Sequence, residues 1–244
     1  MVSLSSLLGD LKVAIGFLTR VPVRVEGEVS LARAMALFPL VGAGVGAVQA
    51  AVFAAAILVL PPFAAALLAL LAGVLLTGGL HEDGLADFAD GLGARGGREQ
   101  RLAAMRDSRI GVYGVLALVF AVGLKASALH APAGMAGLVA AGAVSRGILP
   151  AVMRALGPAR ADGLGAGAGM PSGRVAVVAA GLAGAVCLAA LGPPQGGVAL
   201  LLAGVIAGVV AMTAARRFGG FTGDVLGAAA LCVETVVLLV AGAA

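Results

Sequence analysis

The chain has 244 residues, of which 61% are hydrophobic and only 11% are charged, and its mean hydropathy is +1.11. This amount of polar material is too small to cover a water-soluble globule of the same length. The composition therefore excludes an ordinary soluble domain and indicates a protein that lies in a lipid bilayer.

The balance of charge is basic, with a formal net charge of +4 and an isoelectric point near 9.8. Proteins that bind single-stranded nucleic acid stack bases on aromatic side chains, whereas this chain has one Tyr and no Trp. We therefore expect no nucleic-acid partner. A basic face at a membrane instead attracts anionic lipid head groups and phosphorylated substrates.

Residues 1–35 form a segment that precedes the first long apolar run. Asp10 and Lys12 interrupt its hydrophobic stretch, and no small-residue cleavage site follows them, so the segment lacks the pattern of a secretory signal. We expect an N-terminal helix that lies at the membrane interface or re-enters the membrane from one side.

Seven apolar runs are long enough to cross a hydrocarbon core of about 30 Å. They cover residues 36–60, 62–80, 110–129, 135–153, 175–192, 197–215 and 225–243. The sequence therefore predicts an all-α integral membrane protein, a polytopic bundle of about seven transmembrane helices in a single domain over residues 1–244. Ala and Gly dominate these runs, which permits close approach between packed helices.

Basic residues mark alternate connections between the runs. Arg95 and Arg98 lie in the first long loop, and Arg154 and Arg160 lie in a later one. The connections that contain neither Lys nor Arg are 61–62, 130–132 and 192–196. Because short cytoplasmic loops carry an excess of Lys and Arg, this pattern predicts a cytoplasmic N-terminus.

The segment 78–109 is rich in aspartate and faces the cytoplasm in this topology. Within it, Asp83, Asp87 and Asp90 recur at i, i+4 and i+7, so all three carboxylates project from one face of a helix. Like charges on one stripe repel each other, and a cation among them offsets this repulsion. Mg²⁺ prefers oxygen ligands and shares them with substrate phosphates, so we expect these aspartates to bind Mg²⁺.

Two residues of this segment are candidates for proton transfer. Asp83 could act as a general base instead of a metal ligand, and the spacing leaves both roles open. His81 lies two residues before it and could assist proton transfer or contact phosphate. A structural histidine bonded to a backbone carbonyl fits the sequence equally well.

Further polar groups occur at the same predicted level of the membrane. The segment 106–109 opens the third apolar run, and Asp224 opens the last one. Both are ordinary places for helix caps, but both could also contact substrate. Arg216 and Arg217 precede Asp224 closely and could complete a second half-site for a bulky phosphorylated substrate.

Ionisable residues also occur inside the predicted spans. A charge at this depth costs roughly 3 kcal/mol or more and usually faces a partner or a cavity. We expect Glu234 and Arg146 to pair with each other or to line the site. Lys125 lies near a span end, and we expect its side chain to snorkel toward the outer surface.

Five motifs occur along the chain in a characteristic order: FLTRVP at 17–22, FPLVG at 38–42, GGLHEDGLADFADGL at 78–92, MRDSRIGVYGVLAL at 105–118 and GGFTGDVLGA at 219–228. Together they resemble the cobalamin-5′-phosphate synthase family, the adenosylcobinamide-GDP ribazoletransferases. Glu82 departs from the pattern, which has an apolar residue at this position, but it leaves the aspartate spacing intact.

The resemblance implies the last assembly step of the cobalamin nucleotide loop. GDP-activated adenosylcobinamide reacts with α-ribazole or its 5′-phosphate to give adenosylcobalamin or its 5′-phosphate and GMP, with Mg²⁺ required. It also implies a multi-pass enzyme of the bacterial cytoplasmic (inner) membrane whose site faces the cytoplasm. Other cobalamin-assembly enzymes and a second copy of the chain are further candidate partners, besides the lipid bilayer.

Roles for individual residues follow from this expected reaction. The expected catalytic residues are Asp83, His81 and Arg109, the expected Mg²⁺ ligands are Asp83, Asp87 and Asp90, and the expected substrate-binding residues are Arg106, Asp107, Ser108, Asp224, Arg216 and Arg217.

Two alternatives stay open at this point. CDP-alcohol phosphotransferases also bind a metal and a nucleotide diphosphate with aspartates on membrane helices, but this chain lacks their Ala-Arg after the second aspartate and their two later aspartates. A secondary transporter would fit a helical bundle with a buried Glu234. Against it, the acidic residues cluster at one face and no inverted repeat is visible.

Overall fold

The computed structural model describes residues 4–25, 30–129, 133–159 and 169–243. Throughout these residues the regular structure is helical, and the only β-type pairing is an isolated bridge between Pro158 and Phe221. The predicted all-α class is therefore confirmed. Arg160 and the connection 130–132, which contributed to the predicted topology, lie outside the described residues.

The helices follow the predicted apolar runs. The first half contains α1 (Leu4–Leu18), α2 (Leu31–Ala34), the 3₁₀ helix η1 (Met35–Leu37), α3 (Phe38–Ala56), α4 (Pro62–Thr77), α5 (Leu80–Gly93), α6 (Arg98–Ala104) and α7 (Val112–Ala128). The second half contains α8 (Ala133–Gly147), α9 (Leu149–Leu156), α11 (Gly173–Leu191), α12 (Pro193–Phe218) and α13 (Gly223–Gly242).

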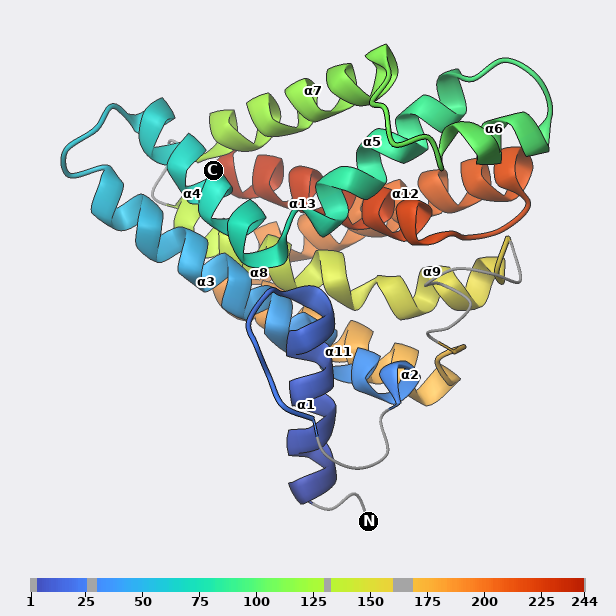
Figure 1. The fold of residues 1–244 in the computed structure, drawn as a ribbon. Helices are drawn as coiled ribbons and strands as arrows, with labels where there is room; N and C mark the ends of the chain where they lie inside the picture. The colour runs from blue at the N-terminus through green and yellow to red at the C-terminus, as the bar shows by residue number, and fades with distance from the viewer. Residues whose placement is uncertain (1–3, 26–29, 130–132, 160–168, 244) are drawn as a thin grey trace.

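Helix α13 is the central element of the bundle. It packs against α5, α7, α8 and α12, and Figure 1 shows it crossing the middle of the molecule between these helices. Val233, Val237 and Leu238 on this helix are fully buried. Most residues of α13 are apolar, and Asp224 and Glu234 are its charged residues. Because several helices pack against α13, these two side chains lie near residues of neighbouring helices.

Small residues allow the helices to approach at backbone distance. On α3, a Cβ added to Gly42 would collide with the backbone of Gly142 on α8, and a Cβ at Gly46 would collide with the backbone at Leu138. Such contacts are typical of helix packing in membranes. At these positions, the high glycine content serves packing.

A sharp bend separates α4 from α5. The two helix axes meet at 93°, and the two residues between them, Gly78 and Gly79, have φ angles of 71° and 72°. Residues with a side chain rarely adopt this left-handed conformation, so two consecutive glycines permit the turn. The predicted span at 62–80 therefore ends at Thr77, and the aspartate-rich helix leaves it at a right angle.

Five helical segments of the described residues are long and apolar enough to cross a membrane: Leu31–Ala56, Gly134–Leu156, Gly173–Leu191, Pro193–Phe218 and Gly223–Gly242. The bent pair α4 and α5 would make a sixth if the two helices form one broken span. The apolar helix α7 has 17 residues and is shorter. A polytopic membrane protein is thus supported, while seven spans and a cytoplasmic N-terminus stay predictions.

In Figure 1, the N-terminal helix α1 projects from the other helices. Leu7 and Leu8 on this helix are exposed by 42% and 53%. These exposed leucines lie near the start of α1, whereas Ala14 and Leu18 further along it are buried in the core. The arrangement fits the interfacial or re-entrant placement predicted for residues 1–35, which stays a prediction.

Candidate active site

The closest approach between two helices at the candidate site is the crossing of α5 and α13. A Cβ built on Gly84 would lie 2.9 Å from the Cα of Gly227 and 3.0 Å from the backbone oxygen of Asp224. Because no side chain separates the two backbones, the crossing brings α5 carboxylates next to the start of α13. Asp83 and Asp87 on α5 and Asp224 on α13 thereby share one site.

Asp87 shows the electrostatic consequence of this gathering. Its pKa is raised to about 6, first because burial removes water from the carboxylate and then because Asp224, Asp83 and Asp90 repel its negative charge. Taken alone, α5 is not among the helices of the described residues that are long and apolar enough to cross a membrane. A cluster of carboxylates that raises a pKa in this way would be stabilised by a bound cation.

Asp90, the third predicted ligand, has a structural partner. Its two carboxylate oxygens accept hydrogen bonds from the backbone N–H of Gly111 at 2.7 Å and from that of Gly114 at 2.9 Å. These amides lie at the start of α7, where the first backbone N–H groups of a helix lack partners within the helix. Asp90 therefore anchors α7 to α5, and its role as a Mg²⁺ ligand stays a prediction.

The donor set fits an open cation site. Within the parts of the chain that the structure describes, no three His, Cys, Asp or Glu side chains converge closely enough to hold a metal by themselves. Mg²⁺, however, is usually bound by one or two carboxylates and completes its shell with water and substrate phosphates. Asp83, Asp87 and Asp224 provide hard oxygen ligands of this kind, so the predicted cofactor is chemically compatible with the site.

Two cavities are lined in part by Asp83. A mainly apolar cavity of about 150 Å³ is lined by Asp83, His81 and Asp224 together with apolar side chains of neighbouring helices. A larger and more open cavity of about 550 Å³ is lined by Asp83, Glu82 and Arg20. Asp83 thus borders both spaces, which is a suitable place for a group that acts between two substrates.

His81 lies on the inner side of this arrangement. It is only 3% exposed and lines the smaller cavity beside Asp83. The structure therefore places the predicted His81 and Asp83 at one cavity.

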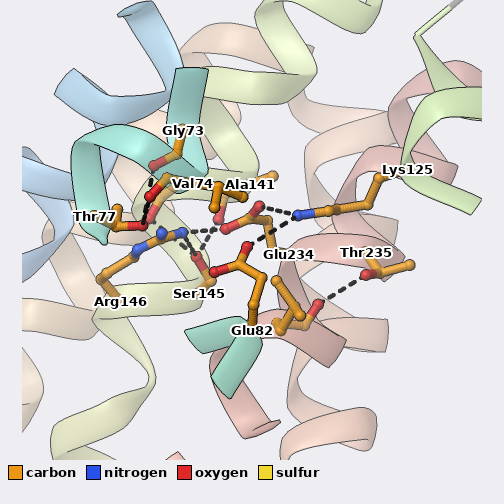
Figure 2. A network of polar contacts seen from close by, with 12 residues as sticks. Gly73, Val74, Thr77, Glu82, Lys125, Ala141, Ser145, Arg146, Glu234 and Thr235 are labelled. Atoms are coloured by element: carbon orange, nitrogen blue, oxygen red, sulfur yellow. Dashed lines mark hydrogen bonds and ion pairs between the residues drawn. The ribbon is translucent and has the colours of Figure 1, made fainter. Parts of the chain in front are cut away.

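Figure 2 shows a network of buried charges that includes Glu82, the residue before Asp83 on α5. Glu234 on α13 forms ion pairs with Arg146 on α8 and, at 2.9 Å, with Lys125 on α7. Glu82 on α5 approaches the Lys125 ammonium at 3.9 Å, and Ser145 accepts a hydrogen bond from the Arg146 guanidinium. The network links four helices and contains two negative and two positive charges, which lowers the cost of burying them.

This network decides two predictions about buried charges. The predicted pairing of Glu234 with Arg146 is confirmed. The prediction that Lys125 snorkels to the outer surface is wrong, because its side chain is only 4% exposed. Glu234 offers it a carboxylate oxygen inside the bundle, so the ammonium is paired without reaching water.

The predicted polar segment at the start of α7 faces solvent. Arg109 and Asp107 bond to each other at 2.8 Å, and this contact lowers the pKa of the Asp107 carboxyl to about 2. Arg106 and Ser108 are exposed as well. These four residues line neither cavity beside Asp83, so their predicted contacts with substrate stay predictions.

Arg216 and Arg217 are exposed as well. They lie in the last turn of α12, which ends at Phe218 shortly before Asp224, and they line neither cavity. Asp224 itself lines the smaller cavity. Of the predicted second half-site, the structure thus brings only the carboxylate to the aspartates of α5.

Sequence reasoning did not assign Arg20 to the site. Its backbone N–H donates to the carbonyl of Leu76 at 2.8 Å, which ties the N-terminal segment to the end of α4 and places Arg20 at the larger cavity. The available signal was its position within the FLTRVP motif.

The fold and the site together define a class of protein. A bundle of apolar helices with clustered carboxylates, one of which borders two cavities, is typical of an integral membrane protein with a polar functional site. Residues 10–242 match the family described as Cobalamin-5-phosphate synthase. The chain therefore belongs to this family.

Curated relatives cover nearly the whole chain. A protein of Bradyrhizobium diazoefficiens is 44% identical over 99% of this chain and 96% of its own length. Relatives from Mesorhizobium japonicum and Ralstonia nicotianae are 42% and 38% identical, each over 98% of this chain and over 94% and 97% of their own lengths. All three carry the name adenosylcobinamide-GDP ribazoletransferase. No solved structure matches the chain.

Proposed function

We propose that this protein joins GDP-activated adenosylcobinamide to α-ribazole or to α-ribazole 5′-phosphate. The products are adenosylcobalamin or its 5′-phosphate, together with GMP. The observation that carries the proposal is the family match over residues 10–242, which includes every residue at the crossing of α5 and α13. It also favours this reaction over the CDP-alcohol phosphotransferase and transporter alternatives.

The reaction is a transfer at phosphorus. A ribose hydroxyl of the acceptor forms a bond to the phosphorus that carries the corrinoid side chain, the bond between this phosphorus and the oxygen of GMP breaks, and GMP leaves. The hydroxyl proton needs an acceptor. Asp83 is the best-placed carboxylate for this role because it borders both cavities.

The remaining carboxylates would prepare the site for the diphosphate. Asp87 and Asp224 would hold Mg²⁺, which when bound neutralises phosphate charge and stabilises the leaving oxygen. Burial and the negative charges of Asp224, Asp83 and Asp90 raise the pKa of Asp87. An anionic substrate therefore needs compensating positive charge before it can enter this site. His81, buried beside Asp83, would orient that carboxylate or relay its proton.

We further propose that the protein lies in the bacterial cytoplasmic membrane with this site on the cytoplasmic side. The alternation of basic and uncharged connections in the sequence supports this orientation. Both substrates are phosphorylated or nucleotide-linked and would then reach the aspartates without crossing the bilayer.

The test uses purified protein in detergent with adenosylcobinamide-GDP, α-ribazole 5′-phosphate and Mg²⁺. We expect a cobalamin product and stoichiometric GMP, and we expect both to disappear in Asp83→Asn and on chelation of the metal. Folded wild-type protein that forms no product would refute the proposed function. Product that persists in Asp83→Asn would preserve the function and remove Asp83 from the chemistry.

A further inference from the structure

The larger cavity beside Asp83 is lined by more acidic than basic side chains. Its lining contains two carboxylates, Glu82 and Asp83, the hydroxyl of Thr77 and one basic side chain, that of Arg20. The other arginines expected at the site, on the segment 106–109 and at the end of α12, do not line it. Arg20 is thus the sole cation that this cavity offers in the described part of the chain.

The backbone around Arg20 is arranged to hold its side chain at the cavity. Arg20 follows α1, and its N–H donates to the carbonyl of Leu76 in the last turn of α4. Its guanidinium lies against Gly78, where a Cβ would collide with the Arg20 Nε. Gly78 also has a left-handed φ of 71°, so this glycine both turns the chain and makes room for the arginine.

The guanidinium keeps its hydrogen-bonding capacity for a ligand. Within the described residues it has no hydrogen bond and no ion pair, and the residue is exposed to solvent. By contrast, Arg33 on α2 pairs with Asp10, and Arg109 pairs with Asp107. A guanidinium offers five donors in a planar fork that matches phosphate oxygens.

We propose that Arg20 binds a phosphate group of a substrate in this cavity. The cavity volume, about 550 Å³, lies in the range of small-molecule and nucleotide sites. The inference rests on the proposed function for the identity of the substrates. Two phosphate groups have the required chemistry: the diphosphate of adenosylcobinamide-GDP and the 5′-phosphate of the acceptor.

The experiment compares wild type with Arg20→Met, Arg20→Lys and the control Arg24→Met, which removes an exposed arginine of the same segment that lines neither cavity. Steady-state kinetics in lipid-free detergent give KM and kcat for each substrate. We expect Arg20→Met to raise KM for a phosphate-bearing substrate about 10-fold to 100-fold. Arg20→Lys restores part of the loss, and Arg24→Met behaves as wild type.

The acceptor distinguishes the two phosphate sources. If Arg20 binds the diphosphate, KM for adenosylcobinamide-GDP rises with either acceptor. If it binds the acceptor phosphate, KM rises for α-ribazole 5′-phosphate and is unchanged for α-ribazole. Equilibrium dialysis of each phosphate-bearing substrate against the same variants measures binding without turnover, so the inference is tested even if the wild type forms no product.

Three results would overturn the inference. Arg20→Met could have the same KM values and binding as Arg24→Met. It could lower kcat alone, with substrate affinity unchanged. A defect that occurs only in vesicles containing anionic lipid would assign Arg20 to lipid head groups instead of the substrate.

Discussion

Replacing Gly84 by Ala tests whether the crossing of α5 and α13 builds the site. The new Cβ would lie 2.9 Å from the Cα of Gly227 and 3.0 Å from the backbone oxygen of Asp224. Carbon atoms rest at about 3.5–4.0 Å, so the two helices must separate by about 0.6–1.1 Å. Both obstructing atoms belong to backbone, so no side-chain rotation can relieve the contact.

This separation moves Asp83 and Asp87 away from Asp224. A displacement of about 1 Å at a reacting group can lower the rate by about 100-fold, and overpacking costs about 1–3 kcal/mol of stability. We expect Gly84→Ala to lower kcat by about 10-fold to 100-fold, to raise the half-saturating Mg²⁺ concentration and to lower the melting temperature in detergent. Gly227→Ala should have the same effects, because its Cβ would lie 3.0 Å from the Cα of Gly84.

The matched control is Gly208→Ala on α12, where an added Cβ meets no atom within 4 Å. This change removes a glycine from a helix without creating a contact, so it should leave activity unchanged and stability equal or higher. If Gly84→Ala retained the activity and Mg²⁺ dependence of Gly208→Ala, the crossing would not position the carboxylates and the reasoning would be refuted.

Three further predictions concern the carboxylates around the site. Glu234→Gln leaves Lys125 and Arg146 buried with Glu82 as the one remaining carboxylate of the network, so the free energy of unfolding should fall by about 3–5 kcal/mol in thermal unfolding. Adding Lys125→Met should restore part of this stability, and equal stability of the single and double variants would contradict the network. Asp90→Ala removes the acceptor of two amides at the start of α7, so stability should fall by about 1–2 kcal/mol, and a variant that unfolds like wild type would show that this anchor is dispensable. The pKa of Asp87 is raised to about 6, so a decrease from pH 7.5 to 5.5 protonates this carboxyl and should raise the Mg²⁺ concentration needed for half-maximal activity. An Asp87→Asn variant should lose this pH dependence, and a wild type without it would contradict the role of Asp87 as a Mg²⁺ ligand.

The site was predictable from the sequence to the extent that it depends on a single helix. The spacing of Asp83, Asp87 and Asp90 follows from helical geometry alone, and the structure has all three on α5. The pairing of Glu234 with Arg146 was also predictable, because a charge in an apolar span has few alternatives to a charged partner.

Features that depend on contacts between distant segments could not be predicted from the sequence. The close approach of Gly84 and Gly227 has no local signal in a chain with 39 glycines. The position of Lys125 near a span end led to the wrong prediction that its side chain snorkels. The carboxylate that pairs with Lys125 belongs to Glu234 on α13. Likewise, the amides that occupy Asp90 belong to α7, and helical spacing within α5 cannot reveal them.

The number of spans was also beyond what hydropathy could determine. The apolar run at 62–80 predicts one straight helix, but Gly78 and Gly79 turn the chain by about 90° before the aspartates. Because glycine permits both a helix and a left-handed turn, the sequence is compatible with either. The structure places the turn where the apolar run meets the polar segment, and after it α5 packs against α13 and α7.

The central claim is that Asp87 and Asp224 form one cation site at this crossing, beside Asp83 as the proposed proton acceptor. The most direct test is electron paramagnetic resonance of Mn²⁺, used in place of Mg²⁺, with purified protein and bound adenosylcobinamide-GDP at pH 7.5. We predict one tight Mn²⁺ site per chain that is weakened in both Asp87→Asn and Asp224→Asn and retained in Asp107→Asn. Equal Mn²⁺ binding by all four proteins would contradict the claim.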